Sequence, residues 1–354
     1  MTGFHLPTHL REAFGWSSDD TVAAPDVLAA ALGMAVPVML GALAGNIPAG
    51  LAAALGSLAI GRARPAGSRR DRLRRLMVLV VLVLLAGLFG VAAGGGSWVG
   101  EVTFLVLAGL AATIGGLGPT FAGIVTMFIL FLAIIKAVPV FGAGQGLALV
   151  GLLALGTLFT LVLRAVFTAV MSRPAESQPQ PAKDPASRRE RFDAWRSSLA
   201  RLSGWNYTIR LVAGLAVAAA IARSAPGHDW HWIALTVVLL TPREPEILSV
   251  MTTQRAIGTL IGVAFTGLVL GTGLPQWALV PVVAVLAGAR TILRSRNYLA
   301  YTTVMAPLII LIIDAGQPPD AALLLDRVTG TLIGAALVVV ANLAWSPLDR
   351  TGKA

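Results

Sequence analysis

Residues 76–93 read LMVLVVLVLLAGLFGVAA, eighteen consecutive residues without a charged side chain. A run of this length and composition is typical of a helix that crosses the hydrocarbon core of a bilayer. Arg72, Arg74 and Arg75 lie directly before it. Because basic residues are retained on the cytoplasmic side of a membrane, this end of the span is predicted to face the cytoplasm.

The rest of the chain has the same apolar character. Of its 354 residues, 56% are hydrophobic and 12% are charged, and the mean hydropathy is +0.80. The charged share is about half that of an ordinary soluble domain, which excludes a soluble globular enzyme. The high hydropathy excludes a disordered chain. The sequence contains no cysteine, so disulfides and thiolate chemistry are also excluded.

Apolar runs bounded by Gly, Pro and charged residues predict an all-α polytopic membrane bundle of about twelve spans in two six-span halves. The predicted spans are residues 27–44, 47–61, 76–93, 99–116, 121–137, 147–171, 208–223, 230–241, 255–271, 276–293, 298–315 and 323–345. The second and eighth are short for a spanning helix, so we expect them to be tilted, broken or partly inserted.

The spans divide the chain into five segments. We expect a cytoplasmic N-terminal segment without a removable signal peptide, a first membrane half, a cytoplasmic linker, a second membrane half and a cytoplasmic tail. Their predicted bounds are residues 1–26, 27–171, 172–206, 207–347 and 348–354.

Basic residues concentrate in three stretches, each of which follows an even-numbered span. They lie at residues 62–75, 173–201 and 290–296. This pattern predicts a multi-pass protein of the cytoplasmic (plasma) membrane with both termini inside. The net charge of +10 and the pI of about 11.2 are therefore a topology signal, and the predicted partner is membrane lipid and not nucleic acid.

In the linker, Phe192, Trp195, Leu199 and Leu202 recur at helical spacing among basic residues. This stripe predicts an amphipathic helix on the inner leaflet, and a dedicated partner site is the alternative.

A ten-residue motif occurs twice in the second half. Residues 255–264 read RAIGTLIGVA and residues 327–336 read RVTGTLIGAA, with seven identical positions. In the predicted topology the two copies run in opposite directions across the membrane, as in the inverted repeats of alternating-access transporters. The two halves of the chain also align weakly at an offset of 181, which pairs Gly33 with Gly214 and Gly90 with Gly271.

Each copy of the motif predicts both close helix packing and anion binding. Two glycines one turn apart let another helix approach, and the threonine beside the first glycine can bond across the contact. These residues are Gly258, Thr259 and Gly262 in the first copy, and Gly330, Thr331 and Gly334 in the second. Arg255 and Arg327 are expected in the first helical turn, where the helix dipole also favours a carboxylate. Alternatively, both arginines only anchor helix ends at the interface.

The second half resembles a known family on several elements together. These are the segment WIALT at 232–236, then Pro242, the first Arg-x-x-Gly-Thr-x-x-Gly motif, Tyr301 and the second such motif. Over residues 207–347 they resemble the fusaric acid resistance protein-like (FUSC) family of integral membrane bound transporters, related to aromatic acid exporters. The resemblance implies efflux of organic, including aromatic, anions driven by the proton motive force. As elements of the resemblance, Trp232 and Tyr301 are candidate substrate contacts. Trp232 can stack on a ring-bearing substrate, or it can belong to the belt of aromatic residues at the membrane interface. A distant similarity to plant malate channels leaves passive channel activity as an alternative function.

Ionisable groups near span ends supply further candidates. A proton-coupled exporter needs a group that titrates between the two faces, and Asp314 after the run LIILII is the first choice. An interfacial carboxylate in water is the alternative. Lys136 is the other coupling candidate, and it can instead pair with Asp314. Arg243 follows the eighth span and is a candidate anion attractor at the inner mouth, or part of a loop that is salt-bridged to itself.

The sequence offers little for catalysis or metal binding. The segment HDWH at 228–231 supplies too few ligands for a metal site, and no clustered carboxylates or paired nucleophile and base occur, so we expect neither an enzyme nor a cofactor. The sequence therefore predicts a secondary transporter that exports small organic carboxylates with proton coupling. A passive organic-anion channel and a non-transporting scaffold are the alternatives. Assembly into a homo-oligomer is compatible with the sequence.

Overall fold

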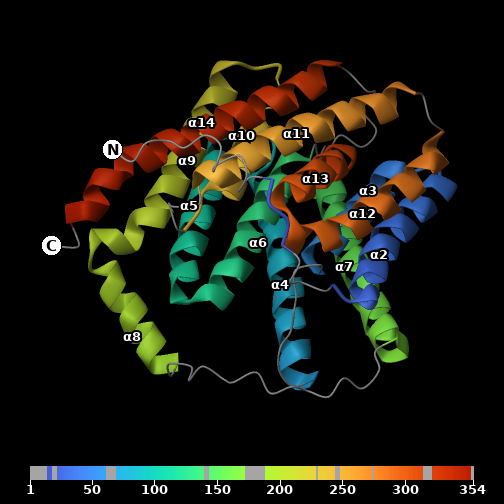
Figure 1. Cartoon of the computed structure of the whole chain (residues 1–354), viewed down its shortest axis with the longest axis horizontal. Helices are drawn as coiled ribbons and strands as arrows, with labels where there is room; N and C mark the ends of the chain where they lie inside the picture. Colours follow the sequence, from blue (N-terminus) through green and yellow to red (C-terminus); the bar gives the residue numbers. More distant parts are fainter. Residues whose placement is uncertain are drawn as a thin grey trace.

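The computed structural model describes residues 14–17, 22–60, 69–138, 143–171, 188–228, 230–243, 248–272, 275–313 and 321–351. Throughout these ranges the regular structure is helical, without a strand. Figure 1 shows a bundle of long helices. The predicted all-α membrane bundle is therefore confirmed as a fold class.

In the part of the chain that the structure describes, the first half contains six helices. They are α2 (Ala24–Leu43), α3 (Ile47–Ile60), α4 (Arg69–Ala93), α5 (Trp98–Ile114), α6 (Pro119–Ala137) and α7 (Ala143–Met171). A single 3₁₀ turn, η1 (Gly115–Leu117), joins α5 to α6. The helix α8 (Arg188–Leu199) and the turn η2 (Leu202–Trp205) then lead into the second half.

The described residues of the second half form six helices as well. They are α9 (Asn206–Ser224), α10 (His231–Leu240), α11 (Leu248–Gly271), α12 (Leu279–Arg296) after the turn η4 (Gln276–Ala278), α13 (Tyr298–Ile313) and α14 (Ala321–Thr351). A helix thus occurs at each of the twelve predicted spans. Six of them, α2, α4, α5, α7, α9 and α14, contain segments long and apolar enough to cross a bilayer. Four others, α3, α6, α10 and α13, are apolar but shorter. The chain is a multi-pass membrane protein, but twelve full spans are not established by length and composition.

The four short helices lie at the centre of the bundle. Along α6, α10 and α13 long runs of residues are buried, and most of α3 is buried as well. They pair across the two halves, α6 with α10 and α3 with α13. Because neighbouring helices surround them, these segments need not match the thickness of the bilayer. Their shortness therefore follows from their central position.

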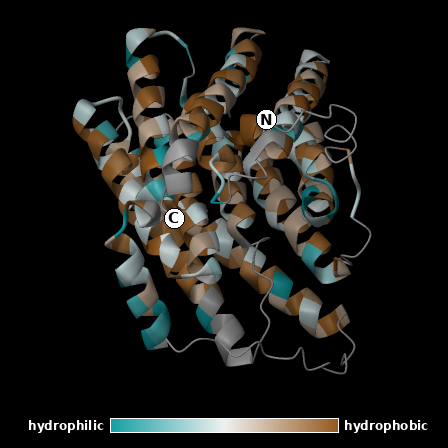
Figure 2. Cartoon of the chain, turned by 60° about the vertical axis from the view of Figure 1, so that its left-hand side comes forward, coloured by the Kyte–Doolittle hydropathy of each residue, from teal (hydrophilic) through white to brown (hydrophobic). Residues whose placement is uncertain are grey.

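The longer helices surround this centre and expose apolar side chains. Leu43, Leu155 and Leu268 have exposed fractions of 78%, 64% and 70%, and similar residues occur along α4, α5 and α14. Figure 2 shows hydrophobic residues spread along the length of the helices. An apolar perimeter of this extent fits a lipid environment.

The helix contacts of one half have counterparts in the other. In the first half α3 and α2 pack on α7 and α4 packs on α6, while in the second α10 and α9 pack on α14 and α11 packs on α13. The contacts between the halves correspond as well, since α2 packs on α12 and α9 packs on α5. In Figure 1, α2 and α12 lie on the right and α5 and α9 on the left.

Candidate functional site

The two copies of the arginine-glycine-threonine motif lie on α11 and α14, and each packs on a central helix. A side chain added at Gly262 would lie 2.6 Å from the carbonyl oxygen of Thr303 and 2.8 Å from Cβ of Ala306 on α13. At Gly334 it would lie 2.9 Å from the carbonyl oxygen of Ile233 and 2.7 Å from Cβ of Thr236 on α10. In both copies the carbonyl precedes the neighbouring side chain by three residues. The second glycines therefore make equivalent helix contacts.

The first glycines make the same kind of contact one turn earlier. A side chain at Gly258 would lie 2.7 Å from the carbonyl oxygen of Leu299, and one at Gly330 would lie 2.7 Å from Cβ of Trp232. Since residue numbers rise together along both partners, each motif helix runs parallel to the central helix it contacts. All four glycines lie where two helices approach too closely for a side chain, as small-residue packing in membranes requires.

The threonines of the motif differ from their prediction. Thr331 donates its hydroxyl to the carbonyl oxygen of Arg327 in its own helix, at 2.8 Å, and not across the contact. Across the α11–α13 contact the donor is Thr302 of α13, whose hydroxyl lies 3.1 Å from the carbonyl oxygen of Gln254. Thr259 is buried, with 1% of its surface exposed. The inter-helix hydrogen bond thus comes from the partner helix, because serine and threonine in helices readily bond to the preceding turn.

Both motif arginines are buried, but neither lies in the first turn of its helix. Arg255 is 3% exposed and Arg327 is 1% exposed. Since α11 begins at Leu248 and α14 at Ala321, both arginines lie well inside their helices. The backbone amides around them are already hydrogen-bonded within the helix. The prediction that a free helix N-terminus adds to anion binding at these arginines is therefore wrong.

Trp232 and Tyr301 are also buried in the bundle. The guanidinium carbon of Arg327 lies 3.9 Å from the centroid of the Trp232 ring, and the tryptophan is fully buried. Tyr301 is 6% exposed and stacks on Tyr298 with 5.9 Å between ring centroids. The indole ring of Trp232 therefore makes a cation–π contact with Arg327 of α14.

Two further buried arginines were missed as site candidates. Arg210 of α9 donates to the side-chain oxygen of Asn342 at 2.7 Å and to the carbonyl oxygen of Pro242 at 3.1 Å. Arg290 of α12 donates to the carbonyl oxygen of Leu58 in the other half, at 3.4 Å. The sequence feature that could have identified both is an arginine within an otherwise apolar run. Arg290 was instead interpreted as one of the basic residues that indicate the cytoplasmic side.

The buried charge of the described residues is strongly positive. It consists of the four arginines Arg210, Arg255, Arg290 and Arg327 and the single aspartate Asp326. A buried ionisable group in a membrane bundle is costly and marks a functional position by default. An interior of this kind can stabilise an anion.

Most of the second half matches a known protein family. Residues 215–341 match the fusaric acid resistance protein-like family. The match lies within residues 207–347, where the sequence resemblance was found, and confirms it. A search of curated proteins gives no match, and a search of solved structures gives none either.

The fusaric acid resistance-like region contains both copies of the motif, with Trp232 and Tyr301, but not the groups that meet it from the first half. At the end of the bundle where α8 lies, here called the linker end, the guanidinium of Arg243 lies 4.2 Å from the centroid of the Tyr207 ring. A terminal nitrogen of Arg243 also fills the space beside Gly115 in η1. Burial lowers the pKa of the Arg243 guanidinium. Next to it, the indole nitrogen of Trp195 donates to the carbonyl oxygen of Thr113, at 2.9 Å.

At the opposite end, here called the far end, ionisable side chains form two pairs. Lys136 bonds to Glu101 at 2.7 Å and His228 to Asp326 at 2.9 Å. Asp314, the predicted proton-coupling group, lies outside the described residues, so its suggested pairing with Lys136 has no structural account, and the partner that Lys136 has is Glu101.

The structure brings the predicted site residues together only in part. The Arg327 guanidinium meets the Trp232 ring, and Gly258 meets the helix that carries Tyr301. Arg243 lies at the linker end and Lys136 at the far end of the bundle. Within the described ranges, no three His, Cys, Asp or Glu side chains are grouped as metal ligands.

Proposed function

We propose that the protein is a secondary membrane transporter that exports small organic anions, including aromatic carboxylates, in exchange for protons. The observation that supports this most directly is the buried charge of the described residues, four arginines against one aspartate. Burying guanidinium groups in a membrane bundle costs free energy that an anionic substrate can offset. The fusaric acid resistance-like match adds support for an efflux-type transporter.

The proposed orientation puts the linker end in the cytoplasm of a plasma-membrane protein with both termini inside. Its support is the concentration of Lys and Arg in residues 62–75 and 173–201, since the first stretch runs into the start of α4 and the second contains α8. In this orientation Arg243 lies at the inner mouth, where it attracts substrate. Arg255 lies in the inner half of the bundle and Arg327 in the outer half.

The proposed mechanism is alternating access between two related sets of helices. Supporting it are the matching helix contacts of the two halves and the equivalent packing of α11 and α14 on central helices. In the proposed topology α11 runs outward and α14 runs inward, so the two copies form an inverted pair. Arg255 and Arg327 then offer a cation to the substrate from opposite sides of the barrier, while Asp314 carries the coupled proton.

The test is uptake of labelled benzoate into inverted, energised membrane vesicles, with and without a protonophore. We expect accumulation that the protonophore abolishes, and loss of at least tenfold in Arg255→Gln and Arg327→Gln. Arg189→Gln is the matched control, because it removes an exposed guanidinium on α8. Flux that only follows the anion gradient, unaffected by the protonophore, would replace the exporter with a channel. An absence of flux for all aromatic carboxylates would overturn the proposed substrate class.

A further inference from the structure

A cavity of about 190 Å³ lies where the two halves meet at the far end. Its walls come from α5 and α6 of the first half and from α9, α10 and the segment before α10 of the second. We refer to this contact between the halves as the seam. The polar and aromatic residues that line the cavity are Glu101, Lys136, His228, His231, Phe104 and Trp230.

We propose that this seam cavity binds the carboxylate of an aromatic acid, with Lys136 as its counter-charge and Glu101 as the group that the ligand displaces. The inference rests on the proposed function, because it names a site for the same class of substrate. It differs from the motif arginines, which lie on other helices.

The size and wall of the cavity fit a single ring that carries a carboxylate. An apolar cavity of about 150 Å³ is large enough for benzene, so 190 Å³ leaves room for a small polar substituent. On α9 the wall consists of Ala218, Ala219 and Ala222, and these small side chains create the space. Phe104 and Trp230 supply aromatic surface against which a ring can pack.

The charged groups of the cavity are arranged for exchange of one carboxylate for another. Lys136 Nζ lies 2.7 Å from a carboxylate oxygen of Glu101 and 5.4 Å from the centroid of the Phe104 ring. The two side chains are 22% and 16% exposed, so neither is sealed in the core. A ligand carboxylate that reaches Lys136 can therefore replace Glu101 as its partner without leaving the ammonium unpaired in a partly buried place.

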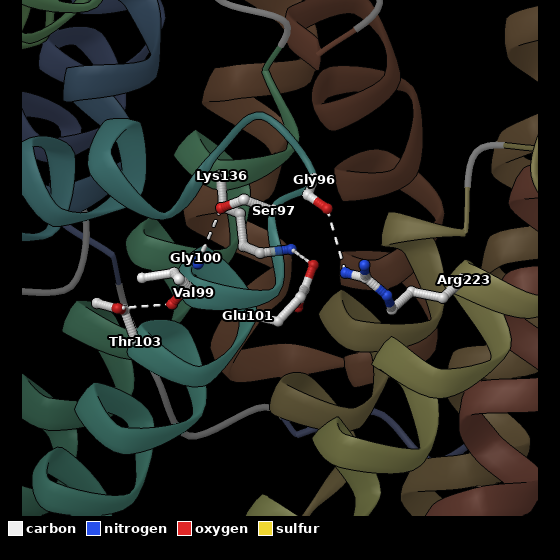
Figure 3. A network of polar contacts seen from close by, with 8 residues as sticks. All are labelled: Gly96, Ser97, Val99, Gly100, Glu101, Thr103, Lys136 and Arg223. Atoms are coloured by element: carbon white, nitrogen blue, oxygen red, sulfur yellow. Dashed lines mark hydrogen bonds and ion pairs between the residues drawn. The ribbon is translucent and has the colours of Figure 1, made fainter.

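Figure 3 shows where the displaced carboxylate can go. Glu101 lies between Lys136 on one side and Arg223 of α9 on the other. The Arg223 guanidinium donates to the carbonyl oxygen of Gly96 at 3.2 Å and is exposed. A turn of the Glu101 side chain away from Lys136 thus brings it toward a second cation, which lowers the cost of the exchange.

Two comparisons within the chain set this pair apart from an ordinary ion pair. The Arg164–Asp26 pair is equally short, at 2.8 Å, but neither residue lines the cavity. In the second half, the residue that corresponds to Glu101 at the offset of 181 is Val282, which lies on α12. The cavity chemistry is therefore specific to the seam of α5 and α6 with α9 and α10.

The test is binding of labelled benzoate to the purified full-length protein in detergent, where no gradient is needed. We expect Lys136→Gln to weaken binding at least tenfold and Lys136→Arg to restore most of it. Glu101→Gln is expected to tighten binding about threefold or more, because it removes the competing carboxylate. Arg164→Gln and Asp26→Asn are the matched controls, and we expect neither to change the affinity.

The opposite signs of the two cavity variants separate the proposal from a structural ion pair. If the pair only holds α5 to α6, Lys136→Gln and Glu101→Gln will both lower the melting temperature and neither will change benzoate affinity, which overturns the proposal. Failure of wild-type protein to bind benzoate overturns it as well. Vesicle transport that persists unchanged in both variants would place the substrate elsewhere and leave the exporter intact. Binding with the expected signs but without transport would support the site and contradict the exporter.

Discussion

The helices α11 and α14 carry the same ten-residue motif, yet their arginines lie in different surroundings. Their glycines meet α13 and α10 in the same way, with Gly262 and Gly334 each facing a backbone carbonyl and a Cβ atom. Arg327 lies on the Trp232 ring, whereas Arg255 has no such ring contact within the described ranges. The comparison teaches that the glycines determine how the helices pack, while the arginines are free to differ in what they bind.

The largest expected effect comes from breaking the shared packing. Gly262→Leu and Gly334→Leu each place a side chain within 3 Å of backbone carbonyl oxygen, and overpacking of this kind costs about 1–3 kcal/mol or more. We expect both variants to yield little monodisperse protein on size-exclusion chromatography. Gly151→Leu on α7 is the control, because nothing lies within 4 Å of a side chain there. A melting temperature near that of wild type for either motif variant would contradict equivalent close packing.

A smaller effect distinguishes the two arginines. Arg327→Gln removes the contact with Trp232, so we expect it to lower the free energy of unfolding by about 1–2 kcal/mol. Arg255→Gln has no ring contact to lose, so we expect a loss of transport with a change in stability below about 1 kcal/mol. Thermal unfolding and vesicle uptake, measured on the same preparations, test this. Equal destabilisation by both substitutions would mean that the two arginines have the same structural role.

The sequence was sufficient to predict where the helices lie, but not which side chains form the contacts between them. Each span follows from the local run of apolar residues, which is why twelve helices lie at the predicted positions. The early start of α11 at Leu248 was missed because residues 248–254 include Ser, Thr and Gln, which a hydropathy pattern counts against a span. The role of Arg210 was missed because its acceptors, Asn342 and Pro242, are distant in sequence.

The pairing of Lys136 illustrates the same limit. Lys136 and Asp314 correspond at an offset of 178, and this suggested an ion pair across the repeat. Correspondence in a repeat does not bring two residues together, whereas α5 and α6 are neighbours in space. Lys136 therefore pairs with Glu101, 35 positions away along the chain.

The smallest expected effect concerns the hydroxyl groups at the two glycine contacts. Thr302 on α13 donates to Gln254 of α11, so Thr302→Val removes a bond between helices. Its counterpart facing the first glycine of α14 is Trp232, and the motif threonine Thr331 bonds only within its own helix. Hydrogen bonds between membrane helices contribute about 0.6 kcal/mol on average. We therefore expect Thr302→Val to lower the free energy of unfolding by about that amount and Thr331→Val to change it less, as measured by thermal or denaturant unfolding. If Thr331→Val were the more damaging substitution, the hydroxyl that joins the helices would belong to the motif after all, and the two copies would differ in packing as well as in their arginines.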